Sequence, residues 1–194
     1  MTEVKSICVY CGSRTGNDPR FSALAESFGA LLARNGIRLV YGGGSVGLMG
    51  MAARSVLAHG GEVIGVIPEH LDHVEITQSG LSELHVVPNM HSRKHLMFEL
   101  SDAFVSLPGS IGTLDETIEV ITWKQLGLHD KPILLVNAER YWDPFDALIR
   151  HVVAAGFASN ETRTLYTMVA GIEDVLPTLG RAPAPMLPDR DELI

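Results

Sequence analysis

The chain has 194 residues, 46% of them hydrophobic and 20% charged, which is enough for one domain with a buried core. Its net charge of −8 at pH 7 argues against a long nucleic-acid backbone as a partner. No apolar run approaches the roughly 18–20 residues that span a bilayer, so the sequence does not indicate a membrane protein. The first residues show no secretory signal and the chain has only two cysteines, so we expect a cytoplasmic location.

Strand-like apolar runs alternate with helical patterns along the chain. Strands are expected at 6–10, 37–41, 62–68, 83–88, 103–107, 132–137 and 165–169. Helices are expected at 19–35, from about 47 to 59, at 92–101, after Thr113, at about 144–155 and near 172–179. This alternation indicates an α/β fold with a mostly parallel sheet of six to seven strands and helices on both faces. We expect residues 1–180 to form a single domain and the proline-rich residues 181–194 to form a loose tail.

Three loops rich in small residues each follow a predicted strand. Their sequences are CGSRTGND (11–18), GGGSVG (42–47) and PGSIGT (108–113). Ligands of parallel sheets bind beyond the carboxyl ends of the strands, near a switch in strand order, so we expect these loops to converge on one site. Their amides are suited to a phosphate or ribose, although the glycines of 42–47 would also suit a tight turn between strand and helix.

The glycine loop at 42–47 formally contains the dinucleotide-binding pattern G-x-G-x-x-G. In dinucleotide-binding proteins this pattern usually follows the first strand of the unit, whereas here it follows the second predicted strand. A site for NAD is therefore disfavoured.

Glu116 has two interpretations, and the spacing alone leaves both open. Thr113-x-x-Glu116 fits a capping box, in which the threonine hydroxyl and the glutamate satisfy amides at a helix N-terminus. Alternatively, a carboxylate that follows a phosphate-binding loop faces the ligand and takes part in its chemistry.

Two further patterns predict little chemistry. Cys8 and Cys11 form C-x-x-C, but Cys8 falls within a strand and Cys11 at its end, on opposite faces, so we expect buried and inert thiols. His91 and His95 are spaced like two metal ligands on a helix, but no third ligand can be named and no metal site is predicted.

Four segments together resemble the Lonely Guy (LOG) family, the cytokinin riboside 5′-monophosphate phosphoribohydrolases. They are YGGGSVGLMG, HSRK, PGSIGTLDE and EVITWKQLGLHDKPILLVN, and the resemblance extends over about residues 6–156. It implies a Rossmann-like, doubly wound homodimer that cleaves the N-glycosidic bond of an N6-substituted AMP to free base and ribose 5-phosphate. The implied partner is a small nucleoside monophosphate, without a cofactor, a nucleic acid or a membrane.

The same resemblance implies catalytic roles for Arg93 and Glu116. Glu116 would stabilise an oxocarbenium-like transition state or deprotonate water, and Arg93 would assist the leaving base or anchor the phosphate. The substrate-binding residues that it implies are Ser13, Gly43, Gly44, Glu75, Lys94, Gly109, Ser110, Ile111, Gly112, Thr113, Asp115 and Thr122. Ser110 departs from the family's usual glycine, and serine would cost about 1 kcal/mol or more if the position needs a positive φ.

Two other functions fit these residues. One is a carrier that binds a phosphorylated nucleotide or pterin cofactor without hydrolysing it, which Arg93 and Glu116 argue against and Ser110 weakly favours. The other is a general nucleosidase for AMP and other nucleoside monophosphates. The helical segment EVITWKQLG carries Ile121, Trp123 and Leu126, which either meet a second copy of the chain or pack into the core.

Overall fold

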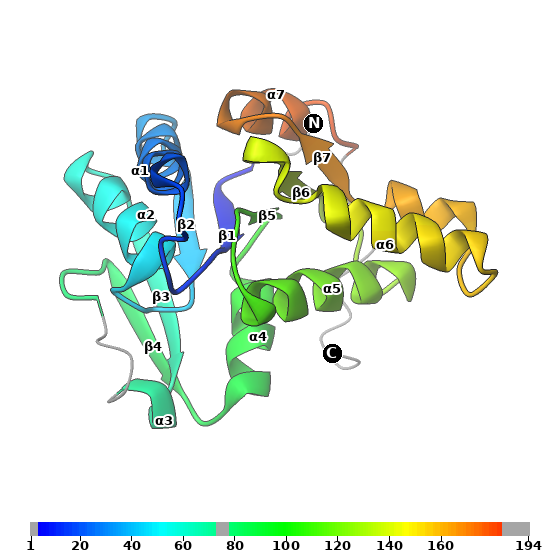
Figure 1. The fold of residues 1–194 in the computed structure, drawn as a ribbon. Helices are drawn as coiled ribbons and strands as arrows, with labels where there is room; N and C mark the ends of the chain where they lie inside the picture. Colours follow the sequence, from blue (N-terminus) through cyan, green and yellow to red (C-terminus); the bar gives the residue numbers. More distant parts are fainter. Residues whose placement is uncertain (1–3, 73–77, 184–194) are drawn as a thin grey trace.

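A computed structural model describes residues 4–72 and 78–183, which form a central sheet with helices on both sides (Figure 1). The strands are β1 (Ser6–Tyr10), β2 (Arg38–Tyr41), β3 (Val63–Pro68), β4 (Glu83–Val87), β5 (Ala103–Ser106), β6 (Ile133–Val136) and β7 (Thr167–Val169). The helices are α1 (Pro19–Arg34), α2 (Gly47–Ala58), α3 (Glu69–Asp72), α4 (Met90–Glu99), α5 (Ile111–Gln125), α6 (Asp143–Ala154) and α7 (Val175–Leu179). Short 3₁₀ turns are η1 (Ala138–Arg140), η2 (Asn160–Thr164) and η3 (Ile172–Asp174).

The strands form a seven-stranded sheet in the order β4-β3-β2-β1-β5-β6-β7, and all their pairings are parallel. The predicted α/β fold with a parallel sheet of six to seven strands is therefore confirmed. Most of the strands are buried throughout because helices cover both of their faces, which is why they appear in the sequence as continuous apolar runs.

The sheet separates two hydrophobic cores. One core contains buried residues of α1, α2 and α7, and the other contains buried residues of α4, α5 and α6. Helices α1 and α2 approach closely at Gly29, where an added Cβ would lie 2.5 Å from the Ala52 carbonyl oxygen. Cys8 and Cys11 point into different cores as buried free thiols, and burial raises the pKa of both.

Strand order reverses at β1, which lies between β2 and β5. The loops that follow β1 and β5 lead to helices on opposite faces of the sheet, and this leaves a place for a ligand between them. The Gly12 amide donates to the Pro108 carbonyl oxygen at 3.1 Å, and the Gly12 carbonyl oxygen accepts from the Leu48 amide at 2.9 Å. The three loops expected to converge therefore do so at the carboxyl edge.

Several predicted boundaries differ from those of the structure. The strand expected from Leu165 begins at Thr167, because 160–164 form the turn η2. The last helix is divided into η3 and α7. No helix in the described ranges is long and apolar enough to cross a membrane. The predicted substrate-binding residue Glu75 lies outside the described residues, and so do residues 184–194 of the predicted tail.

Candidate active site

Arg93 reaches the carboxyl edge of the sheet from the first turn of α4. The Asn89 side chain caps this helix by accepting from the Ser92 amide at 2.9 Å. The Arg93 side chain is only 10% exposed, and its Nε donates to the Val66 carbonyl oxygen at 3.2 Å. Gly42 leaves the space for this side chain, since an added Cβ would lie 1.9 Å from Arg93 Nη2. The glycine that follows β2 thus has a steric role that the sequence pattern did not reveal.

Glu116 lies on α5 opposite Arg93. Its Oε1 is 3.5 Å from Arg93 Nη2, and its side chain is 12% exposed. Burial raises the pKa of Glu116 to about 7, although the positive charges of Arg93 and Lys94 oppose this shift. Glu116 is therefore a shielded carboxylate that gains or loses its proton near neutral pH. It lies beside the guanidinium of Arg93.

Lys94 is held by carboxylates of α5. Its Nζ lies 2.7 Å from Asp115 Oδ2 and 3.2 Å from Glu119 Oε2. Burial lowers the pKa of Lys94, but the hydrogen bonds to Asp115 and Glu119 outweigh this effect and raise the pKa above its usual value. Lys94 therefore supports the α4–α5 contact, and these two carboxylates balance its charge.

The capping-box interpretation of Thr113 and Glu116 is wrong. Helix α5 begins three residues earlier than this pattern requires, with Ser110 at the N-cap, so Thr113 lies inside the first turn and Glu116 in the second. Buried Thr113 packs against Gly109, where an added Cβ would lie 2.0 Å from Thr113 Oγ1. Ser110 has a φ of −104°, so it carries none of the strain considered for serine at this position.

The N-terminus of α5 is open. Within residues 4–72 and 78–183, the amides of Ile111, Gly112 and Thr113 have no acceptor, and the Ser110 side chain makes no capping hydrogen bond. These amides and the helix dipole suit an anion.

At the start of α2, after the glycine loop, the amides of Leu48 and Met49 are not available to a ligand. The amides of Leu48 and Met49 in the first turn of α2 donate to the Gly12 carbonyl oxygen, so they are already satisfied within the fold. Gly43 and Gly44 are both buried, and Gly43 adopts a φ of +81° where the chain turns after β2. Of the two helix N-termini considered for phosphate, α5 is the one that remains available.

Two further predicted substrate-binding residues, Ser13 and Thr122, lie in different surroundings. Ser13 is exposed in the loop that follows β1, on the same edge as α5. Thr122 is exposed, six residues beyond Glu116 on α5, and its hydroxyl donates to the Ile118 carbonyl oxygen at 2.8 Å. Within one chain, Thr122 is therefore not brought to the Arg93–Glu116 pair.

Tyr141 was missed by the sequence analysis. Its hydroxyl donates to the Gly109 carbonyl oxygen, and its ring packs edge-on against Phe21 with centroids 5.9 Å apart. The two residues before it, Glu139 and Arg140, have positive φ values of 52° and 60°. No local sequence pattern predicts a contact between residues that are 32 positions apart. Tyr141 therefore holds the loop that precedes the open end of α5.

The sequence matches a protein family described as "Possible lysine decarboxylase" over residues 49–179. It is 46% identical over 176 residues to a cytokinin riboside 5′-monophosphate phosphoribohydrolase of Rhodococcoides fascians, covering 90% of this chain and 89% of that protein. It is 43% identical to the enzyme of the same name, LOG, of Oryza sativa subsp. japonica, covering 89% of this chain and 74% of that protein. The chain belongs to the LOG family.

The surroundings of Lys94 do not suit the Schiff-base lysine of an amino-acid decarboxylase. A lysine that forms Schiff bases must give up its proton, whereas Asp115 and Glu119 both hold the Lys94 ammonium group and raise its pKa. Among solved structures, a molybdenum cofactor binding protein of Rippkaea orientalis superposes with a TM-score of 0.69. It is 21% identical and covers 93% of this chain and 98% of its own, which shows a shared fold.

Proposed function

We propose that this protein hydrolyses the N-glycosidic bond of cytokinin riboside 5′-monophosphates, which are N6-substituted AMP, to the free base and ribose 5-phosphate. The observation that carries the proposal is the shielded Arg93–Glu116 pair beside the open N-terminus of α5. The names of relatives 43–46% identical to the chain support the same activity. A carrier role is not favoured, because the carrier-like structures share the fold at only 17–21% identity.

The substrate phosphate would bind the amides of Ile111, Gly112 and Thr113 at the N-terminus of α5. Glu116 follows Thr113 by three residues, or roughly 4.5 Å along the helix axis. A nucleotide anchored by its phosphate would therefore place its ribose near this carboxylate. Gly109 and Ser110 complete the phosphate loop, and Asp115 acts through Lys94 rather than on the substrate.

Breaking the bond to the base places positive charge on the ribose, and the ionised Glu116 carboxylate stabilises that charge or takes a proton from the attacking water. A guanidinium does not give up its proton readily in proteins, so Arg93 acts as a charged hydrogen-bond donor to the departing base rather than as an acid. The low exposure of both side chains strengthens these interactions.

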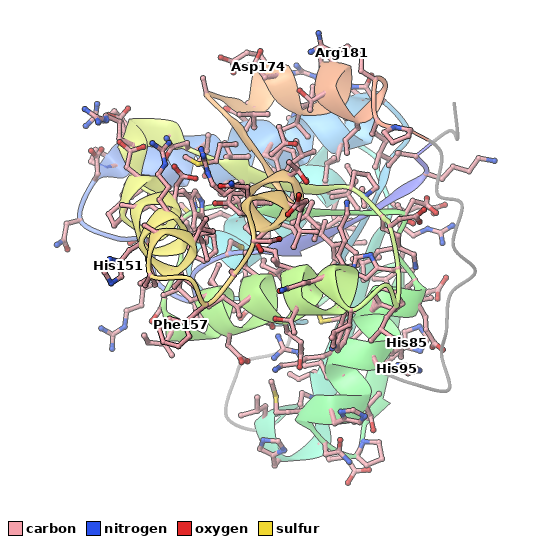
Figure 2. All side chains as sticks on the ribbon, turned by 90° about the vertical axis from the view of Figure 1, so that its right-hand side faces the viewer. His85, His95, His151, Phe157, Asp174 and Arg181 are labelled. Carbon is pink, nitrogen blue, oxygen red and sulfur yellow. The ribbon has the colours of Figure 1, made fainter. Side chains whose placement is uncertain are left out.

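We also propose a cytoplasmic homodimer formed through α5. Ile118 on this helix and Leu126 at its C-cap are 45% and 67% exposed, although Ile121 is buried and Trp123 packs against the core. Figure 2 shows Phe157 beyond the end of α6, where it is 88% exposed. Sedimentation equilibrium should give a dimer for the natural chain and a monomer for Leu126→Asp; a monomeric natural chain would contradict the dimer.

The proposed reaction is tested by chromatography of the purified protein after incubation with N6-isopentenyl-AMP and, in parallel, with AMP. We expect free base from the modified nucleotide and little from AMP. Equal release from both would indicate a general nucleosidase instead. No release from either would contradict hydrolysis.

A further inference from the structure

The cations near the open end of α5 differ in how their charges are balanced. Arg93 faces Glu116, and Lys94 faces two carboxylates. Arg20 pairs with Asp18 and Glu139. Arg14, in the loop that follows β1, makes no ion pair or hydrogen bond with any described residue. Since a helix N-terminus supplies only about half a positive charge, a phosphate dianion there needs a further cation.

Arg14 lies between the starts of α5 and α2. It lines a cavity of about 190 Å³ together with Gly109, Ser110 and Tyr141. It also borders a shallow surface depression together with Gly47. Arg14 is therefore at the same edge of the sheet as the open amides of α5, beside space for a ligand group.

The backbone on both sides fixes the position of Arg14. The Gly12 amide is hydrogen-bonded to the Pro108 carbonyl oxygen, which ties this loop to the one before α5. Gly47 has a φ of +59°, and an added Cβ there would lie 2.4 Å from the Arg14 amide nitrogen. The backbone of Arg14 is thus held against the loops that precede α5 and α2. Little further ordering of the backbone is needed when Arg14 binds a ligand.

We propose that Arg14 binds the 5′-phosphate of the substrate and sets the preference for nucleotides over nucleosides. The inference rests on the proposed function, because it assumes a phosphate at the start of α5. A guanidinium offers two parallel donors to phosphate oxygens, and such charge-assisted hydrogen bonds are stronger than neutral ones. The charge of Arg14 adds to the partial positive charge at the N-terminus of α5. The charge of Lys94 does not, because Asp115 and Glu119 already balance it.

The test compares Arg14→Gln with Arg34→Gln, which removes the same charge from the exposed far end of α1. We expect Arg14→Gln to lower kcat/KM for N6-isopentenyl-AMP roughly tenfold or more, mainly through KM, and to leave the slow cleavage of the nucleoside unchanged. Arg34→Gln should change neither value. An unchanged nucleotide preference in Arg14→Gln, or an equal loss for nucleotide and nucleoside, would overturn the proposal.

Calorimetry with ribose 5-phosphate separates this inference from the proposed reaction. Roughly tenfold weaker binding by Arg14→Gln than by the natural chain and Arg34→Gln would support the role of Arg14 even if no base were released. Equal binding by all three proteins, or binding by none, would overturn it.

Discussion

Replacing Glu116 by glutamine is expected to lower kcat for N6-isopentenyl-AMP by about a thousandfold, with KM little changed and the protein still folded. Glutamine keeps the volume of the side chain but loses the ability to accept a proton and the charge that, in the proposed mechanism, stabilises the oxocarbenium ion. Glu62→Gln is the matched control, because Glu62 makes an exposed ion pair with Arg38 away from the site. A Glu116→Gln protein that retains more than roughly a tenth of the activity would contradict the catalytic role.

The same residue is expected to give the proposed reaction its pH dependence. Burial raises the pKa of Glu116 from 4.5 to about 7. In the proposed mechanism the carboxylate must be ionised to act. The kcat/KM of the natural chain should therefore rise with pH through an acid limb near pH 7. A limb near pH 4.5 would mean that the ionisation of Glu116 does not control the reaction.

The free energy of unfolding should show the matching effect. A carboxyl group with a raised pKa binds more protons in the folded than in the unfolded state between pH 4.5 and 7, so stability falls as pH rises through this window. The shift corresponds to about 3 kcal/mol. Urea unfolding should thus show Glu116→Gln gaining up to this amount relative to the natural chain between pH 4.5 and 8. A difference that does not change with pH would contradict the raised pKa.

The sheet could be predicted because its signal is local. Buried parallel strands such as Ile133–Val136 are continuous apolar runs, and each is followed by a turn or a helix that a short window reveals. The convergence of the three loops also followed from the sequence, since parallel strands all end at one edge. Arg93 and Glu116 were named from the family resemblance, because spacing alone left Glu116 between two roles.

Other features depend on contacts between distant segments or on the choice between similar helix starts. Both Ser110 and Thr113 are acceptable N-cap residues, and the pattern ending at Glu116 favoured the wrong one. The Tyr141 hydroxyl meets the Gly109 carbonyl oxygen only because β5 and β6 are neighbours in the sheet. The glycines of 42–47 were predicted to suit a phosphate, a ribose or a tight turn, and this pattern did not reveal that the missing side chain of Gly42 makes room for Arg93.

This steric role makes Gly42→Ala the second substitution with a large expected effect. The added methyl group would lie 1.9 Å from Nη2 and 3.0 Å from Cζ of Arg93, so the guanidinium must leave its position beside Glu116. Because the clash involves only the end of the Arg93 side chain, we expect the protein to stay folded. Loss of the neighbouring positive charge raises the pKa of Glu116 further, so less of the carboxylate is ionised at neutral pH.

We therefore expect Gly42→Ala to lower kcat/KM at pH 7 by about a hundredfold and to move the acid limb to higher pH. The control is Gly180→Ala, because Gly180 has a φ of −65° and its added Cβ meets the nearest atom at an ordinary 3.4 Å. Arg93→Ala, and the double variant that combines it with Gly42→Ala, should each lower kcat/KM by no more than about the same factor. Both substitutions remove the same interaction, that of Arg93 with Glu116. Normal kcat/KM in Gly42→Ala would show that the position of Arg93 does not matter for the reaction, whereas losses that multiply in the double variant would mean that Gly42 acts independently of Arg93.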